Sequence, residues 1–102
     1  MLEILIDAKQ VAVLTEKIVI NYQGLPFTLT ANGLSGTEDI KLLKSADGTN
    51  FEYMKLFGST VTLNADNNET GIFGTCMLKL EKGITANPVT VTIMTNSITT
   101  VG

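Results

Sequence analysis

Oxygen-bearing side chains are the first candidates for chemistry in this sequence. Asp66-Asn67-Asn68-Glu69 places four of them in a row, and calcium prefers oxygen ligands. A calcium loop, however, spaces its ligands at alternate positions and includes a glycine for its sharp bend. Four consecutive polar residues are instead typical of a solvated turn. The sequence therefore predicts no metal site in this segment.

Catalytic residue types are scarce and poorly placed. The chain has no histidine, the residue most often used as a general base. Glu38 and Asp39 are neighbours, so in a strand they point to opposite faces. Cys76 is the only cysteine and has no basic neighbour that would lower its pKa, so we expect a buried structural thiol. The sequence predicts no catalytic residue and no cofactor.

Two aromatic residues, Phe51 and Tyr53, are spaced so that they share one face of a strand. Such a pair could form a platform on which a sugar ring stacks. Carbohydrate-binding modules usually expose tryptophan or several tyrosines, however, and this chain has no tryptophan. The spacing favours a place in the core, and a carbohydrate- or surface-binding module remains the alternative function.

The clearest local pattern is the turn that precedes these aromatics, Ser45-Ala46-Asp47-Gly48-Thr49-Asn50. Asp47 tolerates the bridge region and Gly48 supplies a positive φ, a combination that suits a type I turn closed by a glycine bulge. The flanking segments alternate between apolar and other residues, with Ile40 and Leu42 on one face of the first arm. The sequence predicts a β-hairpin over residues 37–58, with Phe51 tucked under its turn.

Alternating apolar residues also predict the elements around this hairpin. Short strands are expected near residues 2–6, 10–21, 27–30, 59–64, 77–80 and 87–95. A helical turn at residues 14–17 is the alternative to strand there. Strands at this spacing without an amphipathic helix predict an all-β protein, a single antiparallel β-sandwich of Ig-like or jelly-roll arrangement. We expect one domain over residues 1–102, in which residues 1–22 could form an N-terminal arm or edge strands.

The composition limits the partners of this domain. The net charge is −3, and all seven basic residues are lysines, so nucleic acid is a poor partner because affinity for it is mostly cationic. Only 17% of the residues are charged and 44% are hydrophobic. Either threonine, serine and asparagine solvate the surface, or part of the surface is buried against copies of the chain or against another protein.

The beginning of the sequence does not resemble a targeting segment. Glu3 lies where a signal peptide would carry basic residues, so we expect no signal peptide. No apolar run approaches the roughly 18 residues of a membrane span. We therefore expect no membrane partner.

Four segments resemble small all-β virion proteins of tailed bacteriophages, such as capsid decoration or head-auxiliary proteins. In chain order they are DIKLLKSADGTNFEYMKLFG, VTLNADNNETGIFG, MLKLEKG and NPVTVTIMTN, within about residues 37–95. The resemblance implies a non-enzymatic structural protein that stabilises a symmetric shell. It implies a homo-oligomer that contacts a major capsid or other virion protein, is made in the host cytoplasm and resides in the virion.

Such an assembly would use the ends of the chain. Leu2, Ile4 and Ile6 could add a strand to the open sheet edge of a neighbour, where main-chain pairing provides adhesion. Ile98 and Val101 could do the same from the other end. The alternative is that both ends pack within their own sheet.

Overall fold

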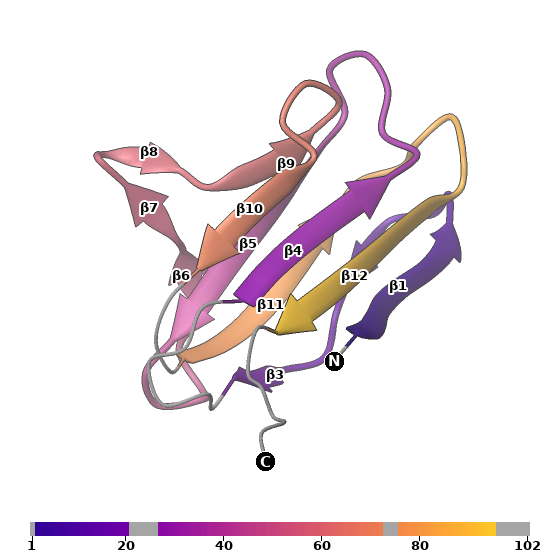
Figure 1. Cartoon of the computed structure of the whole chain (residues 1–102). Helices are drawn as coiled ribbons and strands as arrows, with labels where there is room; N and C mark the ends of the chain where they lie inside the picture. The colour runs from indigo at the N-terminus through magenta and orange to yellow at the C-terminus, as the bar shows by residue number, and fades with distance from the viewer. Residues whose placement is uncertain (1, 21–26, 73–75, 96–102) are drawn as a thin grey trace.

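The computed structural model describes residues 2–20, 27–72 and 76–95, and these residues form strands and no helix (Figure 1). Sheet A has the strand order β1 (Leu2–Lys9), β12 (Val89–Thr95), β4 (Phe27–Asn32) and β10 (Glu69–Ile72). Sheet B contains β2 (Val13–Leu14), β3 (Ile18–Ile20), β11 (Cys76–Lys82), β5 (Asp39–Ser45), β6 (Glu52–Tyr53) and β9 (Thr62–Asn64). A separate two-stranded sheet pairs β7 (Lys55–Leu56) with β8 (Ser59–Thr60).

Sheets A and B face each other as two layers, and every strand pair is antiparallel (Figure 1). The predicted all-β sandwich is therefore confirmed. The strands β2 and β3 pair with successive parts of β11, and β6 and β9 pair with successive parts of β5. Counting each of these couples as one interrupted strand gives eight strands in sheets A and B, apart from the separate pair β7 and β8.

The pairing of these eight strands distinguishes between the two expected arrangements. The first strand pairs with the eighth, the second with the seventh, the third with the sixth and the fourth with the fifth. This is the order of a jelly roll, in which one long antiparallel hairpin is folded into two sheets. The expected jelly-roll alternative describes this chain, and the Ig-like one does not.

The fold is centred in sequence on the predicted turn. Gly48 lies at the midpoint between the partners Leu2 and Met94 of β1 and β12. It is equally the midpoint between the partners Leu43 and Tyr53, which belong to β5 and β6. The chain is therefore one ribbon that reverses at Gly48. The midpoint between paired residues shifts for β5 and β9, beyond the inserted β7–β8 hairpin, and returns to Gly48 at the pair of Leu2 with Met94.

The core lies between the two sheets and follows the expected alternation. Its fully buried side chains include Leu29 of β4, Ile40 and Leu42 of β5, and Val91 of β12. Burial of this apolar area contributes about 25 cal/mol per Å² to folding. The residues that alternate with this buried face of β12 include Thr90 and Thr92, which are half-buried on the outer face of sheet A.

The expected strand at residues 10–21 is interrupted, and it contains a bulge instead of a helical turn. The backbone N–H of Thr15 donates to the carbonyl oxygen of Leu80 at 3.0 Å. The Leu80 N–H in turn donates to the Thr15 hydroxyl oxygen at 2.9 Å. This exchange keeps the chain attached to β11 while residues 15–17 separate β2 from β3.

The N-terminal strand packs within its own sheet, which was one of the two alternatives. β1 pairs with β12 along the edge of sheet A, so residues 2–9 are an edge strand and not a detached arm. Ile6 is only 3% exposed and belongs to the core, so its expected role as a contact to a neighbour is corrected. The register shift between Ile4 and Ile6 turns Ile6 inwards.

Candidate functional site

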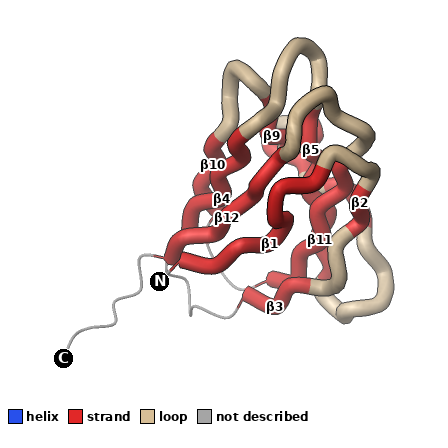
Figure 2. Tube along the Cα trace, turned by 90° about the vertical axis from the view of Figure 1, so that its right-hand side faces the viewer, coloured by secondary structure: helices blue, strands red, loops and turns tan. Residues whose placement is uncertain are grey.

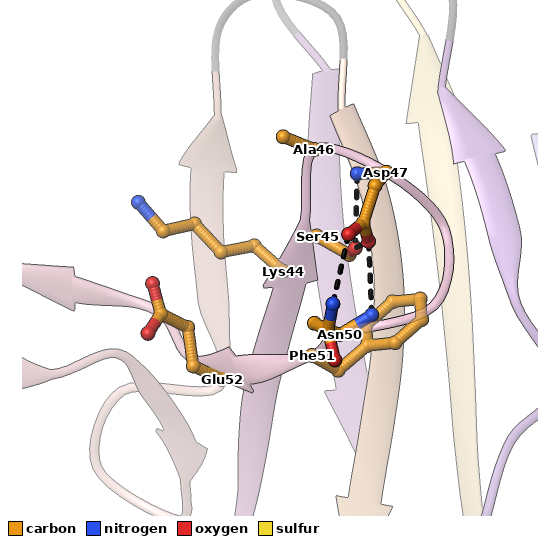
Figure 3. Close-up of a pocket in the computed structure, with 7 residues that line it drawn as sticks. All are labelled: Lys44, Ser45, Ala46, Asp47, Asn50, Phe51 and Glu52. Carbon is orange, nitrogen blue, oxygen red and sulfur yellow. Dashed lines mark hydrogen bonds between the residues drawn. The ribbon is translucent and has the colours of Figure 1, made fainter.

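The hairpin turn is built around the carboxylate of Asp47 (Figure 3). Its Oδ1 accepts hydrogen bonds from the backbone N–H groups of Thr49 at 2.8 Å and Asn50 at 2.9 Å, and from the Ser45 hydroxyl at 2.9 Å. Oδ2 accepts from the Asn50 amide at 2.9 Å. These hydrogen bonds, led by those from the Asn50 and Thr49 backbone, hold the pKa of Asp47 well below its usual value.

Gly48 has the expected positive φ of 80°, and Asp47 and Gly48 together form the predicted turn. An open depression of about 540 Å³ lies beside it, lined by residues that include Lys44, Phe51 and Glu52 (Figure 3). Because Asp47 already accepts hydrogen bonds from the turn itself, its carboxylate is committed to structure.

Phe51 and Tyr53 lie on the outer face of sheet B, which corrects the expectation of a place in the core. Phe51 is half-buried, and Tyr53 is 41% exposed. The Lys79 ammonium lies 4.7 Å from the centre of the Phe51 ring, and the Lys41 ammonium lies 5.7 Å from that of Tyr53. A sugar that stacked on Phe51 from the side of Lys79 would have to displace this cation.

The Tyr53 hydroxyl completes this outer-face network. It donates a hydrogen bond of 2.9 Å to Oε1 of Glu81 on β11. The hydrogen bond and the negative charge of Glu81 raise the pKa of Tyr53. The network links β6 to β11 across β5, and it keeps the ring of Tyr53 in a fixed place at the surface.

The chain between β6 and β9 forms a hairpin that projects from the edge of sheet B (Figure 1). Met54 N–H donates to the Leu42 carbonyl oxygen at 2.8 Å, and Val61 N–H donates to the Met54 carbonyl oxygen at 2.8 Å. These bonds close the base of the excursion. Beyond the base, β7 and β8 pair only with each other among the described residues.

The tip of this hairpin consists of Phe57 and Gly58, with positive φ angles of 54° and 83°. Positive φ at both central residues is the mark of a type I′ turn, which normally carries Asn or Asp followed by Gly. A bulky residue in this region is strained by about 1 to 3 kcal/mol. Phe57 is nevertheless 98% exposed, and the neighbouring Leu56 is exposed as well.

A second exposed apolar group lies on the outer face of sheet A. Leu2 and Ile4 of β1 are each 57% exposed, and Met94 of β12 is 48% exposed. Leu2 and Met94 are direct partners across the two strands, and Ile4 follows Leu2 on the same face. Of the expected contact residues, Leu2 and Ile4 are thus at the surface, whereas Ile98 and Val101 lie outside the described residues.

Lys82 is a buried charged residue at one end of the core. Its ammonium donates to the carbonyl oxygens of Val11 at 2.6 Å and Gly83 at 3.0 Å. Burial lowers the pKa of Lys82, and the carboxylate of Glu38 opposes this effect. Because two carbonyls hold the ammonium, its role is to close the end of the sandwich, and it is not a free nucleophile.

The Asp66-to-Glu69 segment is a turn held by amide side chains. The Asn64 side-chain oxygen accepts the backbone N–H groups of Asp66 at 3.0 Å and Asn67 at 2.8 Å, and the Asn68 amide donates to the Ala31 carbonyl oxygen at 3.2 Å. Within the described part of the chain, no three acidic or thiol side chains gather as metal ligands would. The side chain of Cys76, which the sequence predicts to be a buried thiol, lies outside the described part of the structure.

The sequence did not reveal Phe57, Met94 or Lys82 as special positions. The turn at residues 57–58 was hidden because phenylalanine is a rare first residue in a type I′ turn.

Among the described residues there is no apolar helix of the length that a membrane span needs. Comparisons of the chain with protein-family models, with curated proteins and with solved structures found no match.

Proposed function

We propose that this chain is a non-enzymatic structural protein of a phage particle, of the capsid-decoration or head-auxiliary type. The observation that carries the proposal is the grouping of exposed apolar side chains at two places, the Leu56–Phe57 tip and the surface formed by Leu2, Ile4 and Met94. Grouped apolar surface marks contacts between proteins. The resemblance of residues 37–95 to virion proteins supplies the setting.

The jelly-roll topology supports this proposal only at the level of architecture, because viral capsid proteins, lectins and other proteins share it. The side chains provide the more specific support. The carboxylates of Asp47 in the hairpin turn and of Glu38 in the loop after β4 accept hydrogen bonds from backbone N–H groups. These two carboxylates therefore serve the backbone of this chain, and the proposal assigns them no role in a reaction.

Expression of the chain together with its coding neighbours tests the proposal. Particles purified from such cells by density gradient should contain the chain in fixed stoichiometry, and deletion of its gene should lower the temperature at which the particles rupture. Absence of the chain from purified particles would contradict the proposal. Flanking genes that encode no virion component would contradict it as well.

A carbohydrate-binding module is the second candidate, because the aromatic rings of Phe51 and Tyr53 lie at the surface and not in the core. Retention on a glycan column, lost in both Phe51→Ala and Tyr53→Ala, would support this candidate. Leu43→Ala, at the neighbouring outer-face position paired with Tyr53, serves as the control. A glycan-binding chain that is missing from particles would replace the first proposal with the second.

A further inference from the structure

Two lysine ammonium groups on the outer face of sheet B lie over aromatic rings. The Lys79 ammonium is 4.7 Å from the centre of the Phe51 ring, and the Lys41 ammonium is 5.7 Å from that of Tyr53. Among the described residues, neither ammonium is paired with a carboxylate. Glu81 is the strand partner of Lys41, but its Oε1 accepts the Tyr53 hydroxyl at 2.9 Å. Both cations can therefore take an anion from outside the chain.

The strand pairing keeps the pair of Lys79 and Phe51 apart from Glu81. Lys79 and Tyr53 are both partners of Leu43, so these three side chains form one row on the outer face. β6 and β11 are both antiparallel to β5 and hence run in the same direction. Phe51 precedes the row by two residues and Glu81 follows it by two, so the Lys79 side chain, which reaches Phe51, extends away from Glu81. An anion bound at Lys79 would therefore avoid the nearest carboxylate.

Two open depressions border the aromatic rings. The larger, of about 540 Å³, is lined by residues that include Lys44, Asn50 and Phe51 (Figure 3). The smaller, of about 320 Å³, is lined by Lys44, Glu52, Tyr53 and Lys55. Because Lys44 and Glu52 line both depressions, the two form one run along β6 that passes both rings.

Cations are concentrated at this surface, although the net charge of the chain is −3. Four of the seven lysines lie at the two rings or line the depressions, namely Lys41, Lys44, Lys55 and Lys79. Three carboxylates lie there as well, but that of Asp47 accepts backbone N–H groups and that of Glu81 accepts the Tyr53 hydroxyl. The surface is therefore complementary to a negatively charged ligand.

From these observations we propose that the outer face of sheet B and the depressions along β6 bind an oligosaccharide whose sugar units carry carboxylates. A sugar stacks the C–H groups of one face on an aromatic ring, and its hydroxyl groups bind amide and ammonium groups such as those of Asn50 and Lys44. A neutral sugar on Phe51 would displace the Lys79 ammonium and leave it without a partner. A sugar carboxylate instead gives this ammonium a charge-assisted hydrogen bond.

The inference rests on the second candidate function, the carbohydrate-binding module, and names its ligand class. Isothermal titration calorimetry with trimers of galacturonic acid and of mannuronic acid tests it, and the fully methyl-esterified trimers are the matched neutral ligands. The acids should bind at least about tenfold more tightly than the esters, because hydrogen bonds between charged groups are the stronger kind. Added salt should reduce this preference.

Two variants assign the preference to this surface. Lys79→Met keeps the aliphatic stem and removes the charge, so it should weaken binding of the acids about tenfold without weakening that of the esters. Phe51→Ala should weaken binding of both kinds of trimer, because it removes the stacking ring. Lys9→Met is the control, since it changes the net charge equally but lies on β1, in the other layer (Figure 2). It should bind the trimers as the unaltered chain does.

The inference and the functions proposed above fail in different ways. Esters that bind as tightly as the acids would overturn the charge preference and keep the carbohydrate candidate. Absence of binding by all the trimers at millimolar concentration would overturn both, and it would leave the virion role to the particle experiment. Equal losses in Lys79→Met and Lys9→Met would overturn the assigned surface. Tighter binding of oligothymidylate than of the acids would assign the surface to single-stranded nucleic acid instead.

Discussion

At the scale of single residues, the turn at Ser45 to Asn50 shows how side chains fix a chain reversal. The Asp47 carboxylate accepts hydrogen bonds from two backbone N–H groups, and Gly48 adopts the positive φ that allows the chain to reverse its direction. A Cβ at Gly48 would lie 3.1 Å from the sulfur of Met77 and 3.2 Å from the ammonium of Lys17. The position therefore requires glycine for its backbone conformation and has little space for a side chain.

Gly48→Val is expected to lower the free energy of unfolding by about 1 to 3 kcal/mol, because a β-branched residue is strained at positive φ. Urea unfolding measures this loss. Gly83→Val is a matched control, since Gly83 has no atom within 4 Å of its Cβ position and its φ is not in the left-handed region. A Gly48→Val chain as stable as this control would contradict the role given to Gly48.

Asp47 makes the stability of the turn depend on pH. Its pKa in the folded chain is below the usual 3.8, so its contribution is fully present above that value and declines as the pH falls below it. Asp47→Ala should therefore lower the melting temperature at pH 7, and the difference from the unaltered chain should shrink in acid. Asp66→Ala is the control, and an equal loss at both pH values would contradict this account.

At the scale of elements, the ends of the sandwich are closed by polar groups. Glu38 accepts hydrogen bonds from the backbone N–H groups of Ser35 at 2.9 Å and Ala86 at 2.8 Å, which joins the loop after β4 to the loop before β12. Backbone hydrogen bonds, that from Ala86 first, lower the pKa of Glu38. At the same end of the sandwich, the aliphatic part of the Lys82 side chain, its stem, is buried, and its ammonium donates hydrogen bonds to two carbonyl oxygens.

Lys82→Ala should destabilise the chain by about 2 kcal/mol or more, since it removes a buried stem and leaves two carbonyls without their donor. Lys82→Met should cost less, about 1 kcal/mol, because it keeps the stem and removes a desolvated charge. Urea unfolding of both variants gives the comparison. Equal losses would show that the charge, and not the stem, is the important part of Lys82.

At the scale of the whole molecule, the jelly roll joins the two distant ends of the described chain. Leu2 pairs with Met94, and Lys9 pairs with Val89. Such pairs require large loops to close before they contribute stability. The local turn at Gly48 forms at low entropic cost, so we expect it to precede the pairing of β1 with β12.

This topology predicts slow folding. Refolding monitored by stopped-flow tyrosine fluorescence or circular dichroism should take milliseconds to seconds, as in other proteins dominated by distant strand pairs. Gly48→Val should slow refolding if the turn forms early, whereas Ile6→Val should mainly speed unfolding. Refolding of the unaltered chain much faster than about a millisecond would contradict this expectation.

The sequence by itself determined the alternation of each strand and the turn at Asp47 and Gly48. Both depend on neighbouring residues, because the period of two and the preference of glycine for positive φ are local properties. Ile40 and Leu42 are accordingly buried as expected. The all-β class followed from many such segments in succession.

Only the tertiary structure decided which of these strands meet and which faces remain open. Phe51 and Tyr53 alternate as a buried pair would, but sheet A covers only the other face of sheet B, so they lie at the surface. Ile6 became core through a bulge in β1, and residues 55–60 left the sheet to form the hairpin that exposes Phe57. Burial depends on what packs above a strand, and that is set by residues far away in the sequence.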